Sequence, residues 1–401
     1  LPAPPGALVA ERAGWVLAPA FLDLHCHLRE PGQPWKERIA TATAAAAAGG
    51  FGALCAMANL QPPVDNVERL RDCLSKNRSW ARVPVLQFAA CSEGLAGRSL
   101  APLGDLARAG AAGFSDDGRN ALSLDRLKEA LQQADDVGRV VGVHPEDETM
   151  LAAANPWGGS DPTAWLLRPR EAEASAVRTA LEALRRAGRG RLHLQHLTTA
   201  AAVSLVRDAK REGLAVTAEV TPHHLTLHGP LTDPEAPDRE LTCNPPLRGD
   251  EDRAALWAGL LDGTVDAVAS DHAPHEIPTD PLQRRAPGFS GVQALLSALL
   301  SDPRSEGHLG RLVEALTSGP RRVLGPAADH LPPPTVREGA PAHLTVFDPM
   351  GVWEPEPGTW LSLGSNTPYW RRRLRGVVLA TFSRGRVVYF SQQLAPRADL
   401  G

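Results

Sequence analysis

Histidine and aspartate residues stand at the ends of several short apolar runs in this sequence. The first run ends in Asp23-Leu24-His25-Cys26-His27. Alternate residues of a β-strand point to the same side, so His25 and His27 can hold one metal ion together, with Cys26 directed away from it. Five further residues of these kinds end or follow later runs: Asp117, His144, His196, Asp271 and His275.

Each of these residues on its own predicts little about function. A single His-x-His pair or an isolated histidine is more often part of a core than of a metal site, and Asp116-Asp117-Gly118 alone is typical of a turn. Their joint occurrence at the ends of four or five different strands indicates a metal centre. Nitrogen and oxygen ligands without thiolate suit Zn²⁺ or a similar divalent ion.

Asp117 is the carboxylate of this set that can bridge two such ions, about 3.5–4 Å apart, with a hydroxide between them. A pair of this kind lowers the pKa of bound water and polarises a carbonyl group. The residues therefore predict metal-assisted hydrolysis, or its reversal, at an amide-like carbon.

These side chains need a scaffold that gathers the strand ends. Short apolar runs alternate with amphipathic helical stretches, which predicts an α/β fold with a parallel sheet. Eight strands are expected, the number that closes a (β/α)8 TIM-type barrel, whose catalytic mouth lies at the carboxyl ends of the strands. A doubly wound open sheet is the alternative, but no glycine-rich nucleotide motif follows any strand. The expected strands are Phe21–His25, Ala53–Met57, Val83–Ala90, Gly113–Ser115, Arg139–His144, Arg191–His196, Ala215–Val220 and Val265–Ser270.

The composition of the chain changes after about residue 330, where Leu331-Pro332-Pro333-Pro334 predicts a stiff linker. We expect residues 20–330 to form the barrel. Residues 1–19 and 331–401 are expected to form a small β-rich appendage from the chain termini, with only a short N-terminal part. Its C-terminal strands are expected at His343–Phe347, Gly376–Thr381 and Arg386–Phe390.

The overall composition excludes some classes of protein. The 42 basic and 46 acidic residues give a formal charge of −4, which argues against nucleic acid as the main partner. The five cysteines contain no C-x-x-C pair, and such a scattered set is typical of a reducing cytoplasm. Residues 39–64 carry no charged side chain, but alanine, glycine and threonine dominate them, so they predict a buried helix and strand rather than a membrane span. Leu1–Val9 lacks the basic start and long apolar core of a secretory signal.

Longer motifs resemble one known family over nearly the whole chain. They are Phe21-Leu22-Asp23-Leu24-His25-Cys26-His27-Leu28-Arg29-Glu30-Pro31-Gly32, Ala56-Met57-Ala58-Asn59, Phe114-Ser115-Asp116-Asp117-Gly118, His144-Pro145-Glu146-Asp147, His196-Leu197-Thr198-Thr199, Val220-Thr221-Pro222-His223-His224, Asn244-Pro245-Pro246-Leu247-Arg248, Ser270-Asp271-His272-Ala273-Pro274-His275 and Ser365-Asn366-Thr367-Pro368. These segments resemble the class I dihydroorotases of the amidohydrolase superfamily, in which an aspartate bridges the metals.

The resemblance implies a binuclear zinc site and a reaction. Two zinc ions per chain would be bridged by Asp117 and a hydroxide. The remaining ligands would be His25, His27 and Asp271 for one ion and His144 and His196 for the other. The family reversibly cyclises N-carbamoyl-L-aspartate to dihydroorotate in pyrimidine biosynthesis, and Asp271 would carry the proton in this reaction.

The resemblance also implies substrate contacts and partners. Arg29, with Asn59 and His275, would clamp the substrate carboxylate, since a guanidinium matches a carboxylate with two parallel hydrogen bonds. The other substrate contacts would be Asn244, at the ring edge, and Pro287 and Gly288, through their backbone. A homodimer and a complex with aspartate carbamoyltransferase are the implied assemblies, and neither nucleic acid nor a membrane is expected as a partner.

Two alternatives stay open at this point. Hydantoinases, dihydropyrimidinases and allantoinases share the superfamily, but they usually bridge their metals with a carboxylated lysine, and Gly113–Asp117 contains no lysine. The second alternative is a non-catalytic scaffold that binds aspartate carbamoyltransferase, against which the complete ligand set argues.

His193 is expected in the core or behind the ligands, and His223 and His224 at the mouth without a ligand role. The histidines expected at the surface are His228, His308, His330 and His343.

Overall fold

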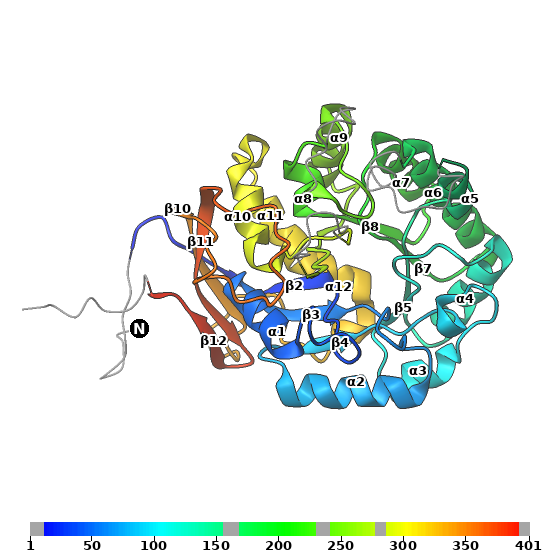
Figure 1. Ribbon diagram of the computed structural model, residues 1–401, viewed down its shortest axis with the longest axis horizontal. Coiled ribbons are helices and arrows are strands. Elements are labelled where there is room, and N and C mark those ends of the chain that lie inside the picture. The colour runs from blue at the N-terminus through cyan, green and yellow to red at the C-terminus, as the bar shows by residue number, and fades with distance from the viewer. Residues whose placement is uncertain (1–11, 155–167, 230–240, 277–285, 393–401) are drawn as a thin grey trace, which may run out of the picture.

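Eight parallel strands form a closed barrel in the computed structural model, which describes residues 12–154, 168–229, 241–276 and 286–392 (Figure 1). Three of the strands pair in one sheet and five in another. Two parallel bridges join these sheets into a ring, one between Ala89 and Phe114 and one between Cys26 and His272. The barrel strands are β2 (Phe21–Cys26), β3 (Phe51–Ala56), β4 (Val85–Gln87), β5 (Gly113–Ser115), β6 (Val140–Val143), β7 (Arg191–Leu194), β8 (Val216–Val220) and β9 (Ala267–Val268).

Helices alternate with these strands and cover the outside of the barrel (Figure 1), which confirms the predicted (β/α)8 fold. They are α1 (Ile39–Ala48), α2 (Val67–Trp80), α3 (Leu103–Ala109), α4 (Leu124–Asp136), α5 (Glu148–Ala154), α6 (Arg170–Ala187), α7 (Ala200–Arg211), α8 (Pro222–Thr226), α9 (Asp250–Leu261), α10 (Leu295–Ser301), α11 (Leu309–Leu316) and α12 (Ser318–Leu324). The helix α4 shows why they pack this way, because it buries one stripe at helical spacing: Leu127, Ala130, Leu131 and Ala134. The open-sheet alternative is wrong because the bridge at Cys26 closes the last strand onto the first.

Several barrel strands are shorter than the apolar runs that predicted them. The last strand is limited to Ala267–Val268, where the sequence predicts Val265–Ser270. The backbone departs from strand geometry just beyond β7 and β9, since His196 and Asp271 have left-handed φ angles of 31° and 42°. His25 lies within β2, whereas the other residues with metal-ligand chemistry stand in the loops that directly follow the strands.

The uncharged segment 39–64 forms the helix α1 and the strand β3, as predicted. The small side chains of Ala45, Ala46 and Ala47 are fully buried, which lets α1 pack closely on the barrel. Within the described ranges, no helix has the length and apolar character required to cross a bilayer.

A second sheet lies beside the barrel, against α1 and α10 (Figure 1). Its antiparallel strands are, in spatial order, β1 (Val16–Pro19), β10 (Leu344–Trp353), β11 (Leu374–Ser383) and β12 (Arg386–Phe390). Phe347 of this sheet packs on Phe21 of the barrel, with ring centroids 6.1 Å apart. The appendage expected from the chain termini also includes residues 1–11 and 393–401, which lie outside the described residues.

His343 is not at the surface, contrary to expectation. It lies where the second sheet meets the barrel, and only 2% of it is exposed. Its backbone oxygen accepts a hydrogen bond from the Ala20 N–H at 2.9 Å, and a Cβ at Gly52 would come within 2.6 Å of its ring. Neither ring nitrogen has a hydrogen-bond partner in the part of the chain that the structure describes. Burial lowers the pKa of His343 to about 4, so the ring is neutral in the folded protein.

Candidate metal centre

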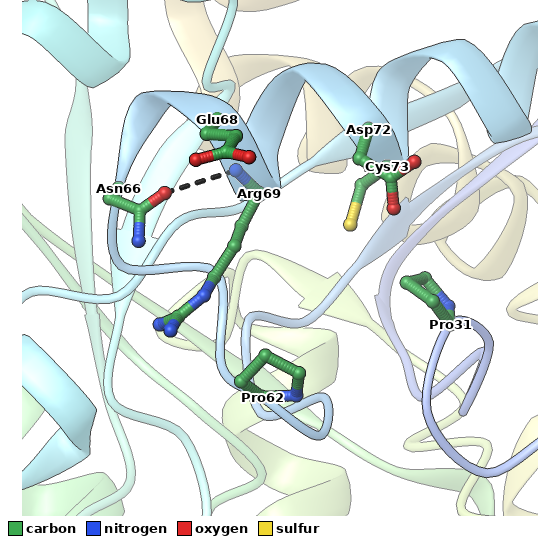
Figure 2. Close-up of a pocket in the computed structure, with 7 residues that line it drawn as sticks. All are labelled: Pro31, Pro62, Asn66, Glu68, Arg69, Asp72 and Cys73. Carbon is green, nitrogen blue, oxygen red and sulfur yellow. Dashed lines mark hydrogen bonds between the residues drawn. The ribbon is translucent and has the colours of Figure 1, made fainter.

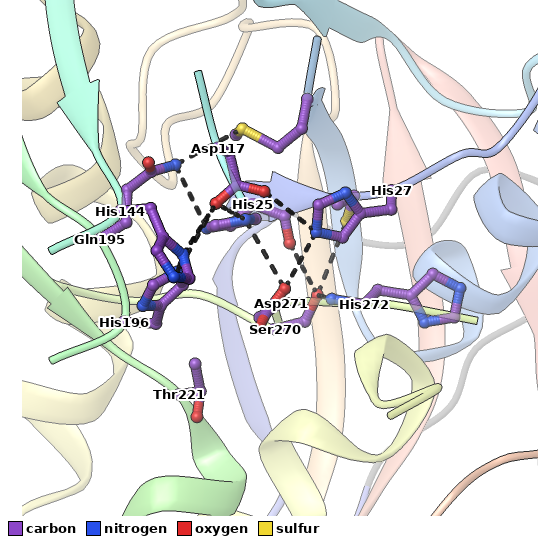
Figure 3. Close-up of polar contacts among 12 residues, drawn as sticks. His25, His27, Asp117, His144, Gln195, His196, Thr221, Ser270, Asp271 and His272 are labelled. Carbon is purple, nitrogen blue, oxygen red and sulfur yellow. Dashed lines mark hydrogen bonds and ion pairs between the residues drawn. The ribbon is translucent and has the colours of Figure 1, made fainter. Parts of the chain in front are cut away.

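Asp117 lies at the centre of a cluster of buried histidines at the carboxyl ends of the barrel strands (Figure 3). Its Oδ1 atom is 3.4 Å from His25 Nε2 and 3.5 Å from His196 Nε2. On the same side, His144 Nδ1 is 3.7 Å from Oδ1. The other oxygen, Oδ2, is 3.5 Å from His27 Nε2. The two oxygens of one carboxylate thus face different histidines, as a bridging ligand requires.

Asp271 completes this cluster. Its Oδ1 atom is 3.1 Å from His27 Nε2 and 3.6 Å from His25 Nε2. Donor atoms of His25, His27 and Asp271 all lie within 4.8 Å of one another, and so do those of His25, Asp117 and His196. The structure therefore brings together all the residues that the sequence proposes as metal ligands.

The cluster fits divalent metal ions because some of its buried donor atoms have no other partner. His25 Nε2 and Asp117 Oδ1 make no hydrogen bond in the described part of the chain. A buried polar atom without a partner costs about 1–3 kcal/mol, and a bound cation would satisfy both atoms at once. Burial opposes the negative charge of Asp117, but His25, His144 and His196 outweigh it and hold the pKa of this carboxyl well below its usual range. The donor set is therefore ionised carboxylate with imidazole, as in zinc-type catalytic sites.

A buried glutamate fixes which nitrogen of His25 faces the cluster. His25 Nδ1 donates to Glu219 Oε1 at 2.8 Å, which leaves Nε2 toward Asp117. Glu219 Oε2 accepts a second hydrogen bond from His193 Nε2 at 3.1 Å. Burial would raise the pKa of Glu219, but the hydrogen bonds from His193 and His25 lower it to about 2. Carboxylates that bind the far nitrogen of a ligand histidine orient its ring and make it a stronger donor.

Glu146 orients His144 in the same way. His144 Nε2 donates to Glu146 Oε2 at 3.0 Å, so Nδ1 faces Asp117. Arg168 donates from one nitrogen both to Glu146 and to Asn244 Oδ1. A continuous set of side chains therefore connects a candidate metal ligand to a candidate substrate contact.

Backbone strain is concentrated at this site. Arg29, His196 and Asp271 have left-handed φ angles of 59°, 31° and 42°. Such angles cost on the order of 1–3 kcal/mol for residues other than glycine, and they persist only where other contacts hold them. One such contact is close to Asp271, since the N–H of Ser270 donates to Asp23 Oδ1 at 2.9 Å. This buried hydrogen bond holds β2 against the segment that carries Asp271.

Arg29 brings a largely buried positive charge to the mouth of the barrel. Its Nη2 donates to His275 Nε2 at 3.1 Å, and its Nε donates to Pro274 O at 3.3 Å. Burial lowers the pKa of Arg29 to about 10, although Asp271 and Asp117 oppose this effect. Burial, with the charge of Arg29, lowers the pKa of His275 to about 3. Arg29 makes no ion pair with a carboxylate in the ranges that the structure describes, so an anionic ligand can supply one.

Asn59 contacts the metal-ligand cluster directly. Its Oδ1 accepts from His27 Nδ1 at 2.9 Å, which turns His27 Nε2 toward Asp271. Its Nδ2 donates to Asp117 Oδ2 at 3.2 Å. Besides the substrate contact that the sequence implies, Asn59 therefore orients two candidate ligands.

Asn366, from the segment after residue 330, ties together the loops at the mouth. Its Nδ2 donates to Ala273 O at 3.0 Å and to Gly288 O at 2.8 Å, and its Oδ1 accepts from the His275 N–H at 2.9 Å. Gly288 has a φ of 144°, and a Cβ there would come within 2.7 Å of Ala273 Cβ, so the position requires glycine. Pro287 and Gly288 thus lie beside His275, on the edge of the site where the sequence places them.

A separate hollow of about 400 Å³ lies between α2 and the loops that carry Pro31 and Pro62 (Figure 2). Its polar groups serve the helix, since Asn66 Oδ1 accepts from the Arg69 N–H at 3.0 Å as the cap of α2. Burial raises the pKa of the Cys73 thiol to about 12, which leaves it unreactive at neutral pH. The residues that line this hollow are not members of the metal-ligand cluster.

Four residues that support the site were given no role from the sequence: Glu146, Arg168, Glu219 and Asn366. Glu146 and Asn366 lie in motifs of the family resemblance, which assigned them no function. Glu219 had a local signal, because a carboxylate inside the apolar strand β8 is unusual. Arg168 had none, because it meets Asn244 only in the folded chain.

Known proteins with similar sequences are dihydroorotases. A family model described as dihydro-orotase-like matches residues 14–156. The dihydroorotase of Anaeromyxobacter dehalogenans (strain 2CP-C) is 40% identical over 384 residues, which cover 94% of this chain and 87% of that protein. The dihydroorotase of Thermus aquaticus is 41% identical over 396 residues, which cover 95% and 90%.

Solved structures with similar folds have lower sequence identity. The L-hydantoinase (dihydropyrimidinase) from Arthrobacter aurescens superimposes with a TM-score of 0.82 at 24% identity, covering 97% of this chain and 89% of that one. The dihydropyrimidinase from Brevibacillus agri NCHU1002 gives a TM-score of 0.81 at 24% identity, covering 94% and 85%. At these identities the likeness concerns the fold alone.

The closed barrel, with carboxylates and histidines gathered at its mouth, defines a metal-dependent cyclic amide hydrolase of the amidohydrolase superfamily. Within that superfamily, sequence identities of 40% and 41% to two dihydroorotases, over 94% and 95% of this chain, are high enough to identify the family. The chain belongs to the dihydroorotase family.

Proposed function

We propose that the protein is a zinc-dependent dihydroorotase that interconverts N-carbamoyl-L-aspartate and (S)-dihydroorotate plus water, in the de novo synthesis of UMP. The observation that carries the proposal is Arg29, a guanidinium at the mouth that has no carboxylate partner among the described residues. An unpaired charge that is largely buried is energetically costly, so it favours the binding of a ligand with the opposite charge. Dihydroorotate has both a cyclic amide and a carboxylate, whereas hydantoin and dihydrouracil lack the carboxylate.

The proposed zinc ligands form two sets that share Asp117. One set is His25, His27 and Asp271, and the other is His144 and His196. Zinc ions, when bound, lower the pKa of a bound water and polarise the substrate carbonyl. Glu219, Glu146 and Asn59 hold the ligand imidazoles in their orientations.

Asp271 carries the proton in the proposed reaction. During ring opening its carboxylate accepts a proton from the attacking water and delivers it to the ring nitrogen that leaves. During cyclisation the same carboxylate takes the proton from the carbamoyl nitrogen and returns it to the departing water. Burial disfavours the charge of Asp271, but His25 and His27 outweigh this effect and hold its pKa well below its usual range.

The remaining site residues bind the substrate in this proposal. Arg29 pairs with the substrate carboxylate, and His275 and Asn59 assist it. Asn244 binds the ring edge while Arg168 holds its amide. The backbone of Pro287 and Gly288 provides the last contacts, and the rigid loop around Asn366 positions them.

A steady-state assay with dihydroorotate, hydantoin and allantoin tests the proposal. We expect turnover of dihydroorotate, and activity on hydantoin or allantoin alone would contradict it. Metal analysis separates the enzyme from a scaffold, because we expect at least two zinc ions per chain. Less than one zinc per chain, without activity that a chelator removes, would favour the scaffold.

The domain division, the location and the assembly are also proposals. Residues 20–330 form the catalytic unit, and residues 1–19 and 331–401 form the β-rich appendage. A cytoplasmic location suits the five cysteines, which are all buried and unpaired. A homodimer, and a complex with aspartate carbamoyltransferase, are tested by light scattering of the protein alone and mixed with that enzyme.

A further inference from the structure

A second group of buried ligand-type side chains lies outside the catalytic cluster. Donor atoms of His223, His224 and Cys243 lie within 4.8 Å of one another, and each residue is at most 2% exposed. The two histidines lie on the short helix α8, whereas Cys243 directly precedes Asn244. The fold therefore brings together donors from two separate segments.

His223 has unused hydrogen-bonding capacity. Neither of its ring nitrogens has a hydrogen-bond partner among the described residues, although only 1% of the residue is exposed. Its ring packs edge-on against Phe289, with centroids 5.2 Å apart, and lies 4.5 Å from the ring of His224. Burial lowers the pKa of His223 to about 4, so a lone pair is available at neutral pH. A buried nitrogen without a partner costs roughly 1–3 kcal/mol unless a ligand binds it.

His224 and Cys243 point at the same backbone oxygen. His224 Nε2 donates to Pro245 O at 3.0 Å, and Cys243 Sγ donates to this oxygen at 3.1 Å. The sulfur and Nε2 are 3.9 Å apart. One thiol and two imidazoles form a donor set that suits zinc and softer ions, and Pro245 O adds an oxygen at the same point.

We propose that His223, His224 and Cys243 form a second metal site, separate from the catalytic centre, for a thiolate-binding divalent cation such as Zn²⁺, Co²⁺ or Cd²⁺. Binding releases one proton, from the Cys243 thiol. The His224 proton moves from Nε2 to Nδ1, and the Nδ1–H group then donates a hydrogen bond to the Thr221 hydroxyl oxygen, 2.7 Å away. The fourth position of a tetrahedral ion is left for Pro245 O or water.

The thiolate makes this site distinguishable from the catalytic centre, which offers only nitrogen and oxygen donors. A cobalt–thiolate bond absorbs strongly in the near ultraviolet, whereas cobalt bound by nitrogen and oxygen gives only weak visible bands. The full-length protein, stripped of metal, is titrated with Co²⁺ while both regions are recorded. We expect a near-ultraviolet band whose final intensity corresponds to one cobalt–thiolate bond per chain.

Variants assign the band to its ligands. Cys243→Ser is expected to abolish it and to keep the visible bands, which also report that the protein is folded. His223→Leu removes no hydrogen bond and is expected to weaken cobalt binding at this site about tenfold or more, as for lesser changes around metal ligands. Cys73→Ser, at a buried cysteine on α2, is the control that keeps the band.

Three results would overturn the proposal. The first is that the unmodified protein shows no near-ultraviolet band in excess Co²⁺. Another is a band that survives Cys243→Ser. The third is that His223→Leu binds cobalt at this site, followed through the near-ultraviolet band, as tightly as the unmodified protein does.

Discussion

Glu146 Oε2 accepts a hydrogen bond from His144 Nε2 at 3.0 Å and so directs Nδ1 of that ring toward Asp117. The same oxygen accepts from Arg168, which also binds Asn244. One buried carboxylate thus orients a candidate metal ligand and holds the cation that supports a candidate substrate contact.

Replacing Glu146 with glutamine is expected to weaken zinc binding about 10–100-fold. The amide is neutral, so it polarises His144 less and no longer pairs with Arg168. Zinc retained during dialysis against a graded chelator series measures the effect. Glu148→Gln is the matched control, because Glu148 is exposed and lines one pocket together with Glu146 and His144. Equal zinc retention in the two variants would show that Glu146 does not position His144.

Asp271→Asn is expected to lower kcat by about 10²–10⁴-fold, because the amide cannot accept the proton of the attacking water. The side chain keeps its size, so the substrate pocket keeps its shape. Activity is measured in excess zinc, and metal content is determined on the same samples, which separates lost proton transfer from lost metal. A fully loaded variant with near-normal kcat would refute the proton-carrying role.

Arg29→Met is expected to raise KM about 10–100-fold with a smaller change in kcat, since a charge-assisted hydrogen bond contributes about 1.5–3 kcal/mol. Steady-state kinetics with dihydroorotate measures both constants. Lys36→Met removes a charge from the same loop and is expected to leave KM within about twofold, because Lys36 is partly exposed. If the two variants behave alike, Arg29 does not bind the substrate carboxylate.

Removal of the metal is expected to abolish activity and to destabilise the fold. An ion present at about a thousand times its Kd stabilises the folded state by about 4 kcal/mol, which is lost when a chelator removes it. Thermal unfolding with and without chelator measures the loss. Zn²⁺ is expected to restore both properties, whereas Mg²⁺, which prefers oxygen ligands, is not. Full activity after verified metal removal would exclude the proposed chemistry.

The stability of the protein is expected to fall between pH 6.5 and pH 4 in part because of His343. Burial, assisted by Arg321 and Arg384, lowers its pKa to about 4, whereas the pKa of a histidine in the unfolded chain is about 6.5. In this window the unfolded chain binds the extra proton, so acid favours unfolding. The effect at pH 5 amounts to about 2 kcal/mol from this residue.

Urea unfolding at pH 7.5 and pH 5 measures the contribution of His343. His343→Leu, which loses no ring hydrogen bond, is expected to lose about 2 kcal/mol less stability over this range than the unmodified protein. His308→Gln, at an exposed position, is expected to behave as the unmodified protein. An unchanged pH dependence in His343→Leu would show that this ring is protonated as readily when folded as when unfolded.

The strand ends show how much of the site is readable from a sequence. His25 and His27 were identified as partners because alternation along a strand is a local property. Asp116 and Asp117 show the limit, since nothing local distinguishes them. The Asp116 carboxylate accepts from the N–H groups of Cys91 and Ser92 at 2.8 and 3.0 Å, whereas Asp117 faces the histidines. The folded chain therefore gives the physical reason for the choice of Asp117 as the bridging carboxylate.

The sequence by itself determined the alternating barrel and the candidate ligand residues at its strand ends, because apolar periodicity and the polar residues that end each run are local features. Only the tertiary structure decided which side chains hydrogen-bond to those candidate ligands and which other groups lie beside them. Glu219 meets His25 across 194 residues, Arg168 meets Asn244 across 76, and Cys243 meets His224 across 19. Such pairs form only when the ring of strands closes in one register, which no short stretch of the chain specifies.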